Sequence, residues 1–212
     1  MHNKYKGLIA LVAPSAAVVT FFVLRFAKLS PIIGSSWGFF SLSDVVMPLT
    51  GTLGLGFGVC AVLARLSYKV LFLRASLTTI LYYLPGFCAA GSWAKKGPLF
   101  RLLLPIVCMI LFVVHPVGFM AAPYCLYWLI PIALYFLNNK SIFLQSLSST
   151  FVAHAVGSVI WLYSFDMSSQ MWLGLIPVVA VERLFFASAM TLVYITGRAC
   201  KRIAVSRVLS YS

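Results

Sequence analysis

The sequence has very few acidic residues and few charged residues of any kind. Its 212 residues include 3 Asp and Glu together against 16 Lys and Arg, and charged residues make up 9% of the chain. Soluble domains carry about 25% charged residues, so this composition excludes a soluble enzyme, a disordered protein and a nucleic-acid-binding protein. The formal net charge of +13 therefore indicates loop charges that orient a membrane protein.

Several motifs that carry chemistry are also missing. The 5 Cys residues form no CxxC pair and show no Cys/His ligand spacing, so we expect neither a disulfide framework nor a zinc site. The chain has no HExxH sequence, no GxSG serine and no Walker A motif. These absences argue against a metalloprotease, a rhomboid-like protease and an ATPase within this chain. No cofactor is expected.

What the chain has in abundance is apolar sequence. Hydrophobic residues make up 62% of it, and the mean hydropathy is +1.03. Because a spanning helix needs about 20 apolar residues, the chain has enough for about six spans. We predict an all-α, polytopic integral membrane bundle of six or seven transmembrane helices, forming a single domain over residues 1–212.

Apolar runs separated by polar or proline-containing stretches mark seven candidate segments. They are predicted at Gly7–Phe26, Asp44–Arg65, Leu71–Trp93, Leu99–Val114, Gly118–Leu137, Ile142–Tyr163 and Met171–Ile195. The first run is long for a signal peptide and lacks a clean cleavage site, so we interpret it as a retained helix. The second is rich in glycine, which predicts tight packing or partial entry into the membrane. The fourth is short for a bilayer and ends at His115–Pro116.

The basic residues are distributed unequally between the two sides of this arrangement. With seven spans, five lie on one side and ten on the other, while Arg183 lies inside a span. The excess of positive charge marks the cytoplasmic side. We therefore predict a multi-pass protein of the cell inner membrane with a cytoplasmic C-terminus. The side of the N-terminus stays open, because six spans would place both termini inside.

Two ionisable residues, Glu182 and Arg183, lie near the middle of the last segment. Charges inside a bilayer are costly and mark functional or tightly paired groups. Adjacent residues point about 100° apart on a helix, so we expect each to find its own partner or a watery cavity. The pair is either structural, joining neighbouring helices, or a ligand or ion site.

A polar stripe follows one face of the sixth segment, at Thr150, His154, Ser158 and Trp161. Spacings of four, four and three place these residues on one helical face. The stripe is either a buried hydrogen-bond seam between helices or the wall of a pocket. Helix rise places His154 and Glu182 at similar depth, which predicts a contact between them.

Other polar and aromatic residues have simpler interpretations. Asp44 opens the second segment and is expected as a helix N-cap or first-turn acid, or as a substrate contact. His115 ends the fourth segment and is expected at the membrane interface. Aromatic residues near the predicted span ends are expected mostly as interface anchors: Tyr124, Tyr127, Trp128, Trp161, Tyr163 and Trp172.

Short pieces of the sequence resemble the S components of energy-coupling factor transporters. Ala13-Pro-Ser-Ala-Ala17 is similar to the AxxxA motif with which their first helix docks on a coupling subunit. The polar stretch from Leu29 to Ser43, followed by Ser43-Asp44-Val-Val-Met-Pro48-Leu-Thr-Gly51, is similar to their gating loop and small-residue second helix. The resemblance implies a small six-helix protein with a micronutrient pocket toward the outer face. A seventh segment departs from this pattern.

We therefore predict a membrane-embedded substrate-binding subunit for uptake of a vitamin-like micronutrient. The partners implied are a small-molecule substrate, membrane lipid, a coupling transmembrane subunit and ATPases, and no nucleic acid. The predicted substrate contacts are His154, Ser158, Trp161, Glu182, Arg183 and Asp44, and the predicted docking pair is Ala13 and Ala17. The alternatives are an intramembrane enzyme and a haem- or quinone-binding membrane protein that uses His115 and His154.

Overall fold

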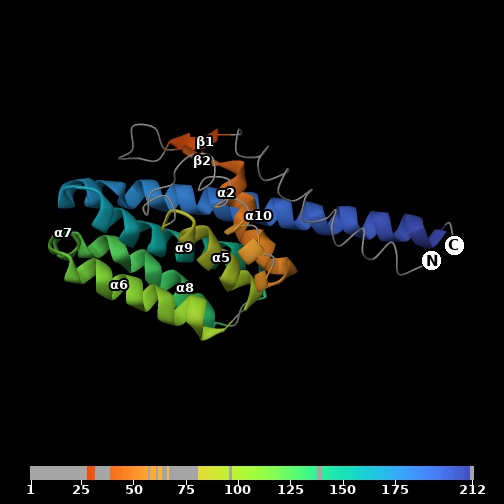
Figure 1. The fold of residues 1–212 in the computed structure, drawn as a ribbon, viewed down its shortest axis with the longest axis horizontal. Helices are drawn as coiled ribbons and strands as arrows, with labels where there is room; N and C mark the ends of the chain where they lie inside the picture. Colours follow the sequence, from red (N-terminus) through yellow and green to blue (C-terminus); the bar gives the residue numbers. More distant parts are fainter. Residues whose placement is uncertain are drawn as a thin grey trace. The chain divides into compact units, whose positions relative to one another are not determined.

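The computed structural model describes residues 28–31, 39–56, 58–60, 62–63, 66, 81–95, 97–137 and 140–210. The chain divides into two compact units, Met1–Lys95 and Lys96–Ser212, each of which is described by itself. The described chain is predominantly helical (Figure 1), which confirms the helical class expected from the sequence. A single domain over the whole chain stays a prediction.

The first unit contains a short antiparallel ribbon that the sequence does not predict. Strand β1 (Lys28–Pro31) pairs with strand β2 (Phe39–Ser41), and Ser30 lies opposite Phe40. Helix α2 (Leu42–Leu49) begins directly after β2. The start of the polar stretch before α2 and its last residues are therefore tied together by backbone hydrogen bonds.

The glycine-rich segment packs tightly and does not run as one helix. Helix α2 passes into the 3-10 turn η1 (Thr50–Leu53), which ends at Gly54, where φ is 110°. Such a positive φ favours glycine. A Cβ atom on Gly51 would collide with the carbonyl oxygen of Ala90 on helix α5 (Leu84–Ala94). The backbones of η1 and α5 therefore meet directly, as the small residues of this segment predict.

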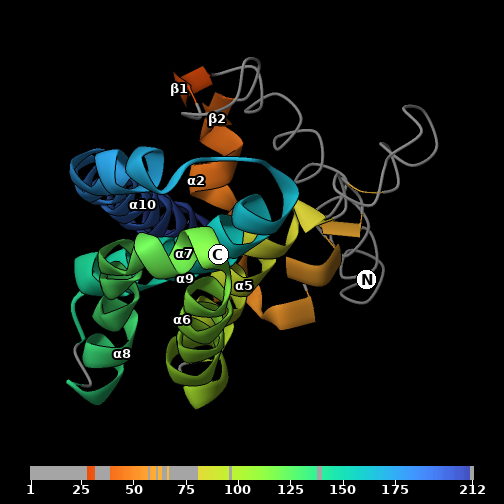
Figure 2. The ribbon, with the colours of Figure 1, turned by 90° about the vertical axis from the view of Figure 1, so that its left-hand side faces the viewer.

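The second unit consists of helical elements that pack around one central helix. They are η2 (Leu99–Leu103, a π-helix), α6 (Leu104–Val114), α7 (Pro116–Met120), η3 (Ala122–Trp128, a 3-10 helix), α8 (Leu129–Phe136), α9 (Ile142–Ser164) and α10 (Ser169–Ser210). Figure 2 shows α9 between α10 and the pair of α6 and α8, all three of which it contacts. The core of this unit therefore lies around α9.

Proline and glycine fix the sharp turn at the end of α6. His115 is extended, with φ −74° and ψ 133°, because the residue before a proline is driven out of the helical region. Helix α7 begins at Pro116 and folds back on α6. A Cβ atom on Gly118 would collide with the carbonyl oxygen of Phe112, so this return requires glycine. The predicted stop at His115–Pro116 is confirmed.

Two helices in the described part of the chain are long and apolar enough to cross a membrane, Ile142–Ser164 and Ser169–Cys200. Two further apolar helices, Leu99–Val114 and Ala122–Phe136, have only 10–17 residues. These four stretches match the last four predicted segments, and the two long helices suggest membrane association. The bundle of six or seven spans stays a prediction, since the first predicted segment, Gly7–Phe26, lies outside the described residues.

Candidate functional site

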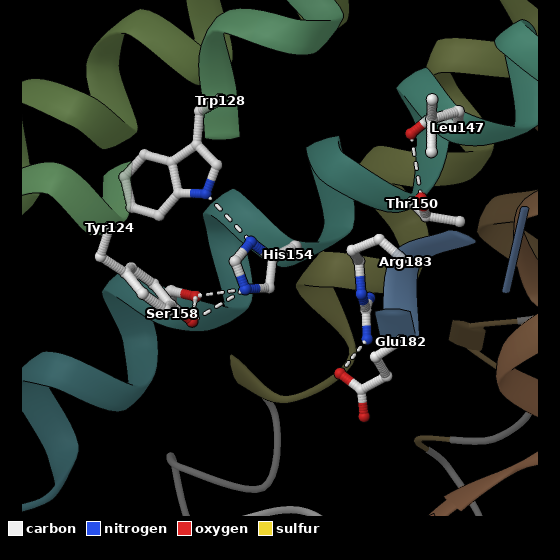
Figure 3. Close-up of polar contacts among 8 residues, drawn as sticks. All are labelled: Tyr124, Trp128, Leu147, Thr150, His154, Ser158, Glu182 and Arg183. Atoms are coloured by element: carbon white, nitrogen blue, oxygen red, sulfur yellow. Dashed lines mark hydrogen bonds and ion pairs between the residues drawn. The ribbon is translucent and has the colours of Figure 1, made fainter. Parts of the chain in front are cut away.

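The imidazole of His154 on α9 is held from two sides by side chains of η3 and α9 (Figure 3). The indole N–H of Trp128 donates to its Nδ1 over 3.1 Å. The hydroxyl of Tyr124, from the same 3-10 turn as Trp128, lies 2.8 Å from its Nε2. Ser158, one turn further along α9, places Oγ 3.4 Å from Nε2 and 3.3 Å from the Tyr124 hydroxyl. Both ring nitrogens of His154 are therefore engaged within the chain.

The contact with Trp128 defines where the proton of His154 resides. An indole N–H can only donate, so Nδ1 must accept and carries no proton. The proton of the neutral ring then lies on Nε2, which donates to the Tyr124 oxygen, and Tyr124 donates in turn to Ser158. The four side chains form one ordered hydrogen-bond chain that runs from Trp128 to Ser158.

An aromatic cluster fixes Tyr124 and Trp128 in these positions. Both are buried, with 2% and 0% of their surface exposed. The ring of Phe112 on α6 stacks on Tyr124 with centroids 5.6 Å apart, and Trp172 on α10 meets Tyr124 edge-on at 4.9 Å. Aromatic pairs in these geometries add to the stability gained by burying the rings. Tyr124 and Trp128 are therefore held beside His154 by rings from α6 and α10.

The sequence alone misplaced part of this cluster. Interface anchoring is wrong for Tyr124, Trp128 and Trp172, which are buried, whereas Tyr163 is 54% exposed. The 3-10 turn η3 directs Tyr124 and Trp128 toward His154 inside the unit. Trp172 lies on α10, where it packs edge-on against Phe112. The only sign of this cluster in the sequence was that Tyr124 and Trp128 follow Pro123 within an apolar run.

Glu182 and Arg183 form an ion pair on α10. Nη2 of Arg183 lies 2.7 Å from Oε2 of Glu182, and their side chains are 7% (Arg183) and 20% (Glu182) exposed. The guanidinium also lies over the ring of Phe186, 4.8 Å from its centroid. The expectation that adjacent residues would not pair is wrong, because two long side chains can bend toward each other across the 100° that separates them.

The predicted contact between His154 and Glu182 is absent. Both nitrogens of His154 bond to the η3 side chains and Ser158, and the Glu182 carboxylate pairs with Arg183. Figure 3 shows the imidazole directed toward Trp128 and Tyr124, with the ion pair to one side.

The polar stripe on α9 divides into separate contacts. His154 and Ser158 share one site, as described above. Thr150 instead donates its hydroxyl to the carbonyl oxygen of Leu147 over 2.9 Å. The indole N–H of Trp161 points to the sulfur of Met167 at 3.1 Å. One helical face therefore serves a hydrogen-bond network at its middle and local contacts at its ends.

Asp44 belongs to the first unit, where it caps α2. Its Oδ2 accepts hydrogen bonds from the backbone N–H of Ser41 at 2.8 Å and from the Ser41 hydroxyl at 2.9 Å. These bonds satisfy donors at the start of the helix. Asp44 therefore has the structural role that the sequence offered as an alternative to substrate binding. Ala13 and Ala17, the predicted docking pair, lie outside the described residues.

The two histidines in the described part of the chain, His115 and His154, lie apart from each other. No three His, Cys, Asp or Glu side chains group there with metal-binding geometry. His115 lies at the end of α6, its ring 5.0 Å from that of Tyr163. Tyr163 is nine residues beyond His154 on α9, or about 14 Å along the helix. The two histidines therefore lie at different depths, and neither ring nitrogen of His154 is free for an axial bond.

Comparison with known proteins identifies no relative. No protein-family model matches the chain, and neither the curated proteins nor the solved structures contain a match.

Proposed function

We propose that this chain is a membrane-embedded substrate-binding subunit that captures a small, vitamin-like molecule for uptake. A coupling transmembrane subunit and ATPases supply the energy in this proposal. The observation that carries it is the Glu182–Arg183 pair, with an Arg183 side chain 7% exposed in the middle of an apolar helix. Ionisable groups at such positions are rare and usually mark a substrate or ion site.

The chemistry of the pair suggests the class of substrate. A guanidinium presents several N–H donors in one plane and binds carboxylates in a two-pronged geometry. In this chain Arg183 is braced by Glu182 on one side and by the Phe186 ring on the other. Glu182 can accept from an amine or a ring N–H. We assign the substrate a carboxylate and a nitrogen donor, attached to a flat ring.

The His154 network supplies the wall of this site rather than its charge. Since both nitrogens of His154 are occupied, we assign it to positioning Tyr124 and Ser158. The Ser158 hydroxyl can turn toward a ligand, and Trp161, which is partly exposed at the end of α9, can stack on a ring. Asp44 contributes through the fold of the first unit, where it caps α2.

The hydrogen bond from Trp128 disfavours an enzyme that uses Ser158 as a nucleophile. Such a serine must give its proton to Nε2 of a neighbouring histidine. In this chain Nε2 carries the proton itself, because Nδ1 accepts from Trp128. The Ser158–His154 pair therefore has the wrong tautomer for a catalytic base. Haem binding is disfavoured by the engaged nitrogens of His154.

The experiment that tests this proposal is mass spectrometry of small molecules that co-purify with the protein. Wild type should carry a bound molecule with a carboxylate, and R183Q and E182Q should lose most of it. K140Q and D166N remove charges of the same signs at exposed positions of the second unit and should retain it. A wild-type protein that carries no small molecule, or four variants with equal loading, would contradict the proposal.

Co-purification of protein partners tests the energy source separately. Solubilised wild-type protein should bring down a transmembrane coupling subunit and ATPases. Loss of ligand in R183Q with retention of these partners would separate the binding site from the docking surface. Ligand binding by a chain that never recruits an ATPase would refute uptake driven by ATPases.

A further inference from the structure

Within the second unit, helix α10 extends beyond α9, the helix that packs along it. Helix α10 has 42 residues, whereas its neighbour α9 has 23. The two are joined by a short connection and packed along each other, and the hydroxyl of Thr191 on α10 donates to Ser146 on α9 over 3.2 Å. Since Ser146 is four residues after the start of α9, the residue of α10 level with that start is close to Ile195.

The residues of α10 around this level change from apolar to basic. Leu192 and Ile195 are 66% and 54% exposed, as expected for side chains that face lipid. Arg198 and Arg202 follow, and both are exposed. At 1.5 Å per residue, Arg198 lies about 5 Å and Arg202 about 10 Å beyond the start of α9. The headgroup region of a bilayer is about 5–8 Å thick on each side of the hydrocarbon core, so Arg198 lies within it and Arg202 near its outer edge.

Beyond Thr191, one face of α10 carries an aromatic side chain followed by two basic ones. Tyr194, Arg198 and Arg202 are spaced four residues apart and share a face. The Arg198 guanidinium lies over the Tyr194 ring, 5.7 Å from its centroid. Tyrosine is enriched where the membrane meets water, with its ring at the headgroup level. A cation that follows it by one turn lies where the phosphates are.

The charge of this region has one sign. No Asp or Glu follows Glu182 in the sequence, whereas four Lys and Arg residues follow Ile195. Clusters of basic residues next to a membrane span attract the anionic lipids of the cytoplasmic leaflet. A protein partner of the same site would need an acidic surface aligned with the helix, whereas a lipid surface satisfies the charge through mobile headgroups.

We propose that α10 beyond Thr191 is a binding arm for anionic phospholipid headgroups, with Tyr194, Arg198 and Arg202 as its contact face. The apolar part of the helix is anchored in the hydrocarbon, and the two arginines hold phosphates at the surface. This surface is separate from the Glu182–Arg183 site, so the two can fail independently.

Cys200 offers a direct probe of this arm. It is exposed and lies between Arg198 and Arg202. Cys60, the other exposed cysteine in the described chain, is replaced by Ser in the probe protein. A fluorophore on Cys200 is then followed in nanodiscs that contain either a quencher-labelled phosphatidylglycerol or the same quencher on phosphatidylcholine, in a common phosphatidylcholine background.

The expected result is quenching about threefold stronger by the anionic quencher than by the zwitterionic one, because two basic residues enrich anionic lipid around the probe. R198Q/R202Q should reduce this ratio to near one, while R198K/R202K should retain most of it. K95Q/K140Q removes two exposed positive charges elsewhere and should leave the ratio unchanged. High salt should weaken the preference.

Two quenching results would overturn the proposal. One is equal quenching by both lipids in the wild-type protein. The other is an anionic preference that R198Q/R202Q leaves unchanged, which would place the anionic lipid elsewhere on the protein. The fluorophore could instead be shielded from solvent equally in both lipid compositions and become exposed only when co-purified proteins are removed. That result would assign this face to a protein partner and also refute the lipid arm.

Discussion

Trp128 donates its indole N–H to Nδ1 of His154 across 3.1 Å, and this bond joins the 3-10 turn η3 to the middle of α9. It sets the tautomer of the histidine, the direction of the hydrogen-bond chain through Tyr124, and the inability of Nε2 to act as a base. A single donor that belongs to a packing residue thereby determines the chemistry available at the centre of the unit.

The tautomer of His154 is the most direct prediction. In wild-type protein labelled with ¹⁵N at histidine, the His154 signals should be those of a neutral ring with its proton on Nε2, since Nδ1 accepts from Trp128. W128F should populate the other tautomer as well, because the donor is removed. A wild-type ring with its proton on Nδ1 would contradict the hydrogen-bond chain and reopen a catalytic role for Ser158.

The contribution of the Trp128 hydrogen bond to stability can be measured separately from the contribution of its ring volume. W128F leaves a buried acceptor without its donor and should lower the free energy of unfolding by about 1–3 kcal/mol beyond the loss of ring volume. Trp172 offers the matched control, because it is 2% exposed, contacts the same Phe112 and has no hydrogen-bond partner for its Nε1. Reversible unfolding in detergent compares the two variants. Equal losses for W128F and W172F would show that packing alone matters.

Glu182 and Arg183 should be coupled in a double-mutant cycle. Removing one member of a largely buried pair takes away the ion-pair partner of the other charge, so E182Q and R183Q should each lower stability. Because Glu182 is 20% exposed, water screens part of the effect, and we expect a coupling energy of about 1–2 kcal/mol. Thermal or denaturant unfolding of the four proteins measures it. Strict additivity would mean that the two side chains are stabilised independently.

The sharp return after α6 should fail when Gly118 gains a side chain. A Cβ at this position would collide with the carbonyl oxygen of Phe112, and backbone cannot move aside as a flexible side chain can. G118A should therefore lower the free energy of unfolding by more than about 2 kcal/mol. Gly174 on α10 has nothing within 4 Å of the position that a methyl group would take, so G174A should be neutral or gain up to about 1 kcal/mol from helix propensity. Similar losses for both variants would contradict the close approach.

The regular, uninterrupted helices were the part of the fold that the sequence predicted well. Ile142–Tyr163 and Met171–Ile195 correspond to α9 and most of α10, because long apolar runs and a polar connection are visible in composition alone. The stop at His115–Pro116 was also predictable, since proline restricts the residue before it. The ribbon of β1 and β2 was not, because it depends on pairing between residues with no apolar alternation.

The candidate site was predicted only in part, for a physical reason. His154 and Ser158 could be placed on one helical face from their spacing. Arg183 could be singled out because a charged side chain in an apolar segment is energetically costly. Trp128 and Tyr124 could not, because they belong to a 3-10 turn and reach His154 across 26 and 30 residues of sequence. Partners that come from irregular turns leave no periodic signal.

The 3-10 turn also changes how far its segment reaches. An α-helix over the 15 residues of Ala122–Phe136 would be about 23 Å long. With the 7 residues of η3 rising about 2.0 Å each and the 8 of α8 rising about 1.5 Å, the same residues extend about 26 Å. A segment too short by residue count thereby comes within a few ångströms of the hydrocarbon thickness of a bilayer, about 30 Å. Tightening a helix lengthens it, and here the residues that lengthen it are the ones that hold His154.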